Sequence, residues 1–216
     1  MPRLTVFDVD HTITSHSTGR RLLQCGRRSG LFGPGSLVSL PYHYVRYRSG
    51  TINAERAVAV LARLNGRTRS DLEAIAAGCY ERRVRDDIMK DARECVEAHI
   101  RAGDVVVLAT SSLGLIVKPL AVGLGVTYIL ATELEFQNDI ATGCLATAPC
   151  YGEEKRDRVI SLAAALRMDL AQASFYSDSH HDLPLLRSVG TPVAVNPDAR
   201  LRKEAVARGW EVLKFR

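Results

Sequence analysis

Short apolar segments alternate with helical patterns over residues 103–216, and this alternation limits the possible folds more than any other feature. The apolar segments lie at residues 4–8, 104–110, 128–131, 174–177, 192–195 and 210–213. The helical patterns cover residues 113–123, 153–167, 180–189 and 198–208. Such an order is typical of an α/β fold with a doubly wound parallel sheet. A weaker alternation over residues 133–147, around Asn138-Asp139, predicts a hairpin.

Residues 13–102 interrupt the alternation after the first strand, and nearly all of them have helical patterns. We predict helices over residues 16–30, 36–48, 54–64, 70–82 and 86–102, with a break at Leu31–Gly35. The 216 residues exceed one small domain and fall short of two average ones. We therefore expect an α/β core made of residues 1–12 and 103–216, with residues 13–102 inserted as a helical cap.

Composition excludes several classes of protein. Hydrophobic residues make up 46% of the chain and charged residues 25%, which rules out a disordered chain. No segment has the ~20 consecutive apolar residues of a membrane span, and the start of the chain does not resemble a signal peptide. The five cysteines have no CxxC spacing, so we expect reduced thiols and a cytoplasmic protein rather than a disulfide framework or a zinc site.

The charge balance favours a small anionic partner. The 29 basic and 24 acidic residues give a net charge of +5, which suits an anionic substrate or a weak contact with a membrane surface. Nucleic acid is not expected, because the charge is modest and only seven Tyr, five Phe and one Trp are available for base stacking. Most of the scattered arginines are interpreted as solvated helix faces.

Acidic side chains follow two of the predicted strands. Asp8 and Asp10 are two residues apart, so their side chains point the same way in an extended chain, and Asp178 and Asp182 follow the strand at 174–177. The carboxyl ends of parallel strands share one edge, where ligands bind. Alone, these residues could begin a turn or cap a helix. Together they favour a cation, and oxygen-only ligands favour Mg²⁺.

Polar residues at two further points fit the same edge. Thr110-Ser111-Ser112 lies between a predicted strand and a predicted helix, where a hydroxyl and backbone N–H groups can bind phosphate or simply cap the helix. Lys155 opens a predicted helix and is the natural counter-charge for a phosphate and an aspartate. His180 and His181 are expected to be exposed residues at a helix start, because no matching Cys or His spacing indicates a soft metal.

The order and spacing of these residues resemble a known superfamily. Asp8-x-Asp10-x-Thr12, Thr110, Lys155 and Asp178-Ser179-x-x-Asp182 are similar to the four motifs of the haloacid dehalogenase superfamily. The resemblance covers the whole chain. A helical cap between the first two motifs, and the closing segments 176–186 and 190–197, resemble the phosphoserine-phosphatase-like subfamily of IB hydrolases.

The resemblance implies a Mg²⁺-dependent phosphatase and a role for each motif residue. Asp8 would attack phosphorus and form an aspartyl-phosphate, and Asp10 would act as general acid and then general base. Phosphate would be bound by Thr110, Ser111 and Lys155. Mg²⁺ would be held by the carboxylates of Asp8 and Asp178 and the backbone carbonyl of Asp10. Asp182 would orient Lys155 or a metal-bound water, and Thr12 would shape the first loop.

The expected cap departs from the phosphoserine phosphatases that it resembles. Their glutamate nine residues after the nucleophile corresponds to Ser17, and their cap arginine aligns with Ala59, although Arg56 or Arg63 could replace it. We take Ser17, Arg20 and Arg56 as candidate substrate contacts. The apolar residues between 31 and 45, with arginines around them, are either cap core or a surface for a phospholipid headgroup.

We therefore expect a phosphatase for a small phosphorylated metabolite resembling phosphoserine, histidinol phosphate or phosphoethanolamine. A phosphatidylglycerophosphate-type lipid phosphatase is the alternative within the class. A receiver-like module that accepts phosphate on Asp8 without turnover is a second alternative, and Asp10 and the inserted cap argue against it. A nucleotide-sugar transferase with Asp8 and Asp10 as its metal-binding pair is a third, and the N-terminal position of the pair argues against it.

Overall fold

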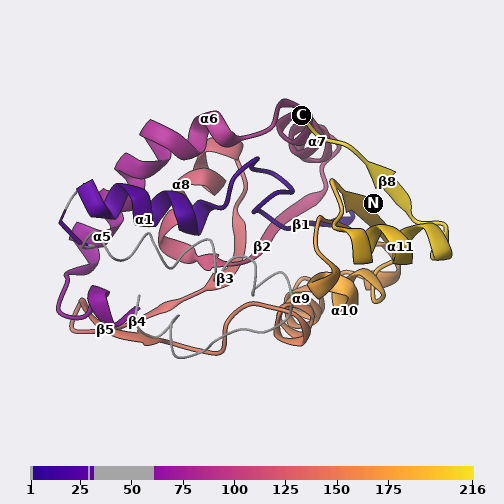
Figure 1. The fold of residues 1–216 in the computed structure, drawn as a ribbon. Coiled ribbons are helices and arrows are strands. Elements are labelled where there is room, and N and C mark those ends of the chain that lie inside the picture. The colour runs from indigo at the N-terminus through magenta and orange to yellow at the C-terminus, as the bar shows by residue number, and fades with distance from the viewer. Residues whose placement is uncertain (1, 29, 32–60) are drawn as a thin grey trace.

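A parallel sheet forms the centre of the molecule in the computed structural model, which describes residues 2–28, 30–31 and 61–216 (Figure 1). The sheet has six strands in the order β3-β2-β1-β6-β7-β8, and every pair is parallel. The strands are β1 (Leu4–Phe7), β2 (Val105–Leu113), β3 (Tyr128–Thr132), β6 (Ser174–Ser177), β7 (Thr191–Val195) and β8 (Glu211–Leu213). The predicted α/β fold with a parallel sheet is confirmed.

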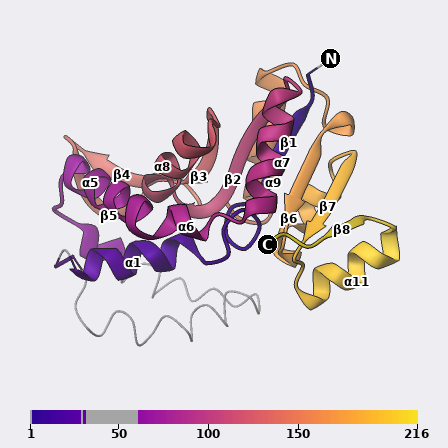
Figure 2. The same ribbon diagram turned by 90° about the horizontal axis from the view of Figure 1, so that it is seen from above.

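The strand β1 lies at the middle of the sheet because all four of its residues can be buried. It pairs with β2 on one side and β6 on the other, so that Val6 lies beside Val107 and Phe175. Figure 2 shows β1, β6 and β7 side by side. Leu4 and Val6 belong to one hydrophobic core and Phe7 to the other, as expected when both faces are covered by helices.

Helices cover both faces of the sheet. One core contains side chains from α7 (Lys90–Arg101) and α8 (Gly114–Leu124). The opposite core contains side chains from α9 (Glu153–Ala165), α10 (Leu183–Leu186) and α11 (Ala199–Arg208). Two short 3₁₀ turns, η3 (Leu170–Gln172) and η4 (His180–Asp182), flank β6. None of the helices in the described ranges is long and apolar enough to cross a membrane.

A hairpin connects the sheet to α9. Its strands β4 (Leu134–Gln137) and β5 (Ile140–Leu145) are antiparallel, and Asn138 and Asp139 form the turn. Both turn residues have positive φ, 50° and 61°, which is the backbone of the tight turns that match the twist of a hairpin. The structure thus contains the hairpin that the weak alternation predicted.

The inserted segment is mostly helical in the residues that the structure describes. It contains α1 (Thr18–Arg28), the 3₁₀ turn η1 (Ala62–Leu64), α5 (Arg69–Cys79), the π-helical η2 (Tyr80–Val84) and α6 (Arg85–Asp87). The helix predicted over 36–48 and most of the helix predicted over 54–64 lie outside the described residues, as does Arg56.

The two ends of the insertion meet at one point. The Ser15 N–H donates to the Asp87 carbonyl at 2.8 Å, and the Met89 N–H donates to the Ile13 carbonyl at 2.9 Å. Helix α7 follows this junction and packs on the sheet, with His99 Nε2 3.1 Å from the Tyr176 hydroxyl of β6. We propose that the core resumes near Lys90 rather than at residue 103.

Two local predictions are wrong. Ser111 and Ser112 do not follow the second strand but lie within β2, whose pairing with β3 shifts register between Ala109 and Leu113, and the next helix begins at Gly114. The helix predicted over 180–189 is a 3₁₀ turn followed by a short helix that ends at Leu186. In both places the prediction relied on the local preferences of polar Ser, Thr and His residues. The backbone conformation there is set by tertiary contacts instead.

Candidate active site

The predicted site residues of the core meet at the carboxyl-terminal edge of the sheet. Asp8 directly follows β1, Asp178 directly follows β6, and Thr110 lies in the second half of β2. Lys155 is in the first turn of α9, and Asp182 ends η4. All five are buried. This is the edge at which open α/β sheets bind ligands.

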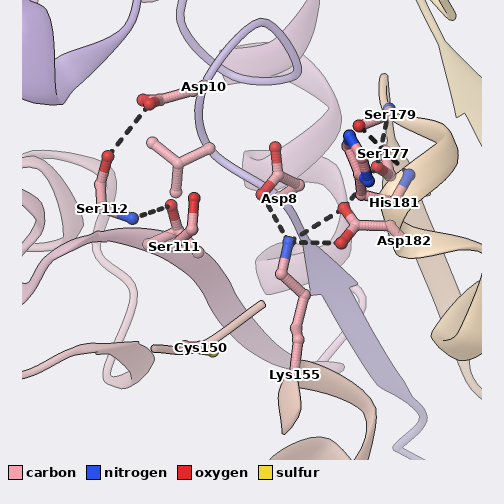
Figure 3. Close-up of polar contacts among 12 residues, drawn as sticks. Asp8, Asp10, Ser111, Ser112, Cys150, Lys155, Ser177, Ser179, His181 and Asp182 are labelled. Atoms are coloured by element: carbon pink, nitrogen blue, oxygen red, sulfur yellow. Dashed lines mark hydrogen bonds and ion pairs between the residues drawn. The ribbon is translucent and has the colours of Figure 1, made fainter. Parts of the chain in front are cut away.

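Lys155 lies between two carboxylates. Its Nζ donates to Asp8 Oδ1 at 2.8 Å and contacts both oxygens of Asp182, Oδ1 at 2.8 Å and Oδ2 at 2.9 Å (Figure 3). Ser177 Oγ donates to Asp182 Oδ2 at 2.6 Å, so the second carboxylate is held from both sides. Lys155 is only 2% exposed, which makes this a buried ion-pair network rather than a surface salt bridge.

The network has less positive than negative charge. Burial raises the pKa of Asp8 to about 7, and the charge of Lys155 offsets this only in part, while Asp182 adds to the rise. Burial disfavours the charged form of Lys155, but Asp182 and Asp8 outweigh it and hold the Lys155 pKa well above its usual value. The lysine therefore stays protonated, and the site is poised to accept further positive charge.

Asp10 lies apart from this network. Its Oδ1 accepts hydrogen bonds from the Thr18 N–H at 2.9 Å and the Thr18 hydroxyl at 2.7 Å, and its Oδ2 accepts from Ser112 Oγ at 3.0 Å. Figure 3 shows the Asp10 and Asp8 carboxylates as separate groups on one side of Lys155. Thr12 is fully buried, and its Oγ1 has no hydrogen-bond partner among the described residues.

Two of the three residues expected to bind phosphate, Thr110 and Ser111, lie in β2 rather than at a helix N-terminus. Thr110 is 1% exposed, and its Oγ1 accepts the Ser112 N–H at 3.1 Å. The Ser111 carbonyl accepts the hydroxyl of Thr132 at 2.8 Å. Because α8 begins at Gly114, residues 110–112 are not the start of that helix, and phosphate binding by their hydroxyl and N–H groups stays a prediction. The hydroxyl of Thr110 is nevertheless at the same sheet edge as Asp8.

The histidines after β6 are not the exposed pair that we predicted. His180 is buried, and its Nδ1 lies 2.8 Å from Asp198 Oδ2 while its Nε2 lies 3.1 Å from a guanidinium nitrogen of Arg200. Since the guanidinium can only donate, Nδ1 carries the proton that Asp198 accepts. Asp198 also donates its backbone N–H to the Asp178 carbonyl at 2.8 Å, so this cluster supports the loop that carries Asp178.

The structure describes two of the three candidate substrate contacts in the cap, Ser17 and Arg20. Ser17 directly precedes Thr18, and its Oγ accepts the Arg20 N–H at 3.4 Å. Arg20 is exposed. The neighbouring Arg21 is not a solvated arginine, because it makes a two-pronged ion pair with the buried Asp87 at 2.6 and 2.7 Å.

The oxygen donors at this edge fit a hard divalent cation. Three buried carboxylates, Asp8, Asp178 and Asp182, accompany the single buried lysine, Lys155. In the described part of the chain no cluster of three or more His, Cys, Asp and Glu side chains has metal-binding geometry. Two carboxylates with one backbone carbonyl are a smaller set, of the kind that suits Mg²⁺, which keeps several of its waters.

Sequence reasoning missed three residues that orient the site. Thr18 lies within the helix predicted over 16–30. It is the first residue of α1, and the N–H of a residue at a helix start needs a partner outside the helix. Ser177 ends β6 and Asp198 opens α11, and both looked like ordinary strand-end and cap residues. No local signal shows that their partners are Asp182 and the Asp178 loop.

Comparison with known proteins agrees with this geometry. Residues 5–187 match the family model of haloacid dehalogenase-like hydrolases. Phosphoserine phosphatase SerB1 of Mycobacterium tuberculosis is 34% identical over 216 residues, which cover 97% of this chain and 70% of that protein. The histidinol-phosphatase of Neisseria meningitidis is 32% identical over 222 residues and covers 100% of both chains.

Solved structures show the same fold. A Bordetella pertussis protein with unknown function has a TM-score of 0.87 at 30% identity, with 99% of each chain covered. A substrate-bound phosphoserine phosphatase has a TM-score of 0.72 at 15% identity, with 99% of this chain and 93% of that chain covered. The chain therefore belongs to the haloacid dehalogenase-like hydrolases.

Within that family the chain is phosphoserine phosphatase-like, and it is a phosphoric monoester hydrolase. This finding argues against the receiver-like module and the nucleotide-sugar transferase that the sequence left open.

Proposed function

We propose that this protein is a Mg²⁺-dependent phosphatase that hydrolyses a small phosphorylated metabolite through an aspartyl-phosphate on Asp8. The observation that carries the proposal is the buried bridge from Lys155 to Asp8 and Asp182, with a second acid, Asp10, two residues away. The ammonium group beside the buried carboxylate reduces its repulsion of a dianionic phosphate, so the phosphate can come close enough for attack.

In the first step an Asp8 oxygen attacks phosphorus. Oδ1 is held by Lys155, and in Figure 3 the other carboxylate oxygen points away from the lysine. We assign the attack to that second oxygen. The bond from this oxygen to phosphorus forms, the bond from phosphorus to the substrate oxygen breaks, and Asp10 gives its proton to the departing alcohol.

In the second step water attacks the aspartyl-phosphate. Asp10 now takes a proton from that water, the Asp8–phosphorus bond breaks, and inorganic phosphate leaves. Lys155 and the hydroxyl of Thr110, with Ser111, would bind the phosphoryl oxygens in both steps. The Asp8 and Asp178 carboxylates and the Asp10 carbonyl would hold Mg²⁺, which would neutralise phosphoryl charge and keep the phosphate in line with Asp8.

Two observations support a substrate class: the names of the relatives, and one residue at which this chain differs from the phosphoserine phosphatases. The relatives are named for phosphoserine and histidinol phosphate, both alkyl phosphates that carry an amine. The residue nine positions after Asp8 is the uncharged Ser17 rather than a glutamate. We therefore propose an amine-bearing alkyl phosphate for which Ser17 makes a neutral contact, with histidinol phosphate or phosphoethanolamine ahead of phosphoserine.

The test measures phosphate release from a panel with Mg²⁺ and with a chelator. The panel contains p-nitrophenyl phosphate, phosphoserine, histidinol phosphate, phosphoethanolamine and a short-chain phosphatidylglycerophosphate. We expect Mg²⁺-dependent release, and its rank order identifies the substrate. Preference for the lipid would favour the alternative within the class. Absence of release from every compound, together with no phosphate trapped on Asp8, would contradict the proposal.

Two variants test the roles of individual residues. Asp8→Asn is expected to reduce turnover by at least ~1,000-fold while the free energy of unfolding stays similar, because the residue is the nucleophile. Asp178→Ala is expected to raise the Mg²⁺ concentration needed for half-maximal activity by about tenfold or more. An unchanged Mg²⁺ titration would remove Asp178 from the metal site.

A further inference from the structure

The Asp10 carboxylate is held by residues from two distant parts of the chain. Thr18, the first residue of α1, binds Oδ1 through both its N–H and its hydroxyl, at 2.9 and 2.7 Å. Ser112, in β2, donates to Oδ2 at 3.0 Å, and the Thr18 and Ser112 hydroxyls are 2.8 Å apart. Thr18 is fully buried and Ser112 is 8% exposed, so water competes little for these bonds.

The hydrogen bonds leave one acceptor position open. A carboxylate has about four lone-pair positions, two on each oxygen. Thr18 occupies both positions on Oδ1, whereas Ser112 occupies one position on Oδ2. Neither of these two donors occupies the second position on Oδ2. The remaining position on Oδ2 is therefore the one that can exchange a proton with a substrate oxygen.

We propose that Ser112 and Thr18 are positioning residues that fix the Asp10 carboxylate so that Oδ2 faces the leaving group. This inference rests on the proposed function, because it assigns Asp10 the role of general acid. The inference also gives different roles to three consecutive residues of β2. Thr110 and Ser111 are proposed to contact phosphate, whereas Ser112 acts through Asp10.

The clamp links the inserted segment to the chemistry. Thr18 can reach Asp10 only while α1 stays in place, and the ion pair from Arg21 to Asp87 holds α1 against the other end of the insertion. Ser15 Oγ also donates to the Asp87 carbonyl at 3.1 Å. The insertion therefore helps to orient the acid.

The choice of leaving group separates positioning from a purely structural role. An alkoxide is a poor leaving group and must receive a proton as the phosphorus–oxygen bond breaks, whereas p-nitrophenolate can leave without one. A misplaced Asp10 therefore lowers kcat/KM, which reports the leaving-group step, for alkyl phosphates and barely changes it for p-nitrophenyl phosphate. The second step, in which Asp10 acts as base, is common to both substrates and affects kcat. General damage to the fold slows both reactions alike.

The experiment compares kcat/KM for p-nitrophenyl phosphate with kcat/KM for the alkyl phosphate of the panel that the wild type hydrolyses fastest. We expect Ser112→Ala and Thr18→Val each to lower the alkyl value about 10- to 100-fold and the p-nitrophenyl value less than about threefold. Thr18→Ser keeps the hydroxyl and should restore most of the alkyl activity. Asp10→Asn should show the same selectivity with a larger loss.

Ser188→Ala is the matched control. It removes one partly buried serine hydroxyl that donates to a backbone carbonyl in α10, and it should leave the ratio of the two kcat/KM values unchanged. Equal losses on both substrates in Ser112→Ala and Thr18→Val, with Asp10→Asn still selective, would overturn the inference and leave the proposed function intact. Equal losses on the two substrates in Asp10→Asn, or no hydrolysis of any alkyl phosphate by the wild type, would overturn both the inference and the proposed function.

Discussion

A single buried lysine lies between two carboxylates at the active-site edge. Lys155 is 2% exposed and contacts Asp8 and Asp182 at 2.8 Å each. A buried ion pair often adds little net stability, since both charges must give up water. Removing one partner is costly, because the other charge is left buried and unpaired.

We predict that Lys155→Met lowers the free energy of unfolding by about 3–5 kcal/mol, measured by urea denaturation, and abolishes activity. The double variant Lys155→Met with Asp182→Asn should be more stable than the single variant, because one of the two uncompensated carboxylates is gone. A single variant within ~1 kcal/mol of the wild type would show that the carboxylates find other partners.

At the scale of elements, close contact between helices depends on one glycine. Gly123 lies inside α8, and a Cβ built on it would be 1.9 Å from the Tyr80 hydroxyl of the π-helical η2. Tyr80 is buried, so it has little room to move away. This contact connects the end of the inserted segment to a helix of the core.

We predict that Gly123→Ala lowers the free energy of unfolding by about 1–3 kcal/mol. The sign of this change tests the argument, because a Gly→Ala substitution inside an unhindered helix raises the free energy of unfolding by roughly 1 kcal/mol. Gly19→Ala in α1 is the matched control, since its added Cβ would meet Ser17 and Ser112 oxygens at ordinary distances of 3.7 and 3.8 Å. Equal stabilisation by both exchanges would contradict the argument.

At the scale of the whole molecule, one polar network joins α7, β1, β6 and Asp104, the residue that precedes β2. His99 Nδ1 lies 2.8 Å from Asp104 Oδ2 and 3.3 Å from the Thr5 hydroxyl, and its Nε2 lies 3.1 Å from the Tyr176 hydroxyl. Partial burial opposes ionisation of Asp104, but hydrogen bonds from His99 and the Arg3 N–H outweigh it and hold the Asp104 pKa below its usual value.

This pKa shift predicts how stability depends on pH. A carboxyl group whose pKa is lower in the folded state stabilises the protein above its unfolded pKa, near ~3.9, and loses that contribution as the pH falls through the folded value. Asp104→Asn should therefore cost about 1–2 kcal/mol at pH 7. The gap between variant and wild type should narrow as the pH falls below the unfolded pKa, near ~3.9. Urea midpoints at several pH values test this.

The exposed Glu73 of α5 provides a control for the loss of a surface charge. Glu73→Gln should change the free energy of unfolding by less than ~0.5 kcal/mol at pH 7. A constant gap between Asp104→Asn and the wild type from pH 7 to pH 3 would show that Asp104 does not stabilise through its charge.

Short-range signals were enough for much of the fold. The strand at 174–177 and the helix at 198–208 lie where the pattern places them, within one residue, and the Asn138-Asp139 turn joins two strands as predicted. The placement of Asp8, Asp178 and Lys155 at one edge also follows from the alternation, since parallel strands point their carboxyl ends the same way.

Other features depend on partners far away in the chain. Ser111 and Ser112 look like loop residues locally, yet β2 continues through them because it lies beside β3. His180 looks like an exposed residue, yet Asp198 and Arg200 bury and orient it. Nothing near Thr18 in the sequence indicates that it binds Asp10 together with a serine 94 residues further on.

The sequence by itself thus determined the parallel sheet, the helical character of the insertion, the family and the residue types at the active-site edge. These follow from periodicity and motif order, which are properties of short segments. The tertiary structure alone decided the hydrogen bonds that hold Asp10, the charge imbalance around Lys155 and the length of β2. Those depend on burial and on pairs of residues brought together by folding, which local patterns do not encode.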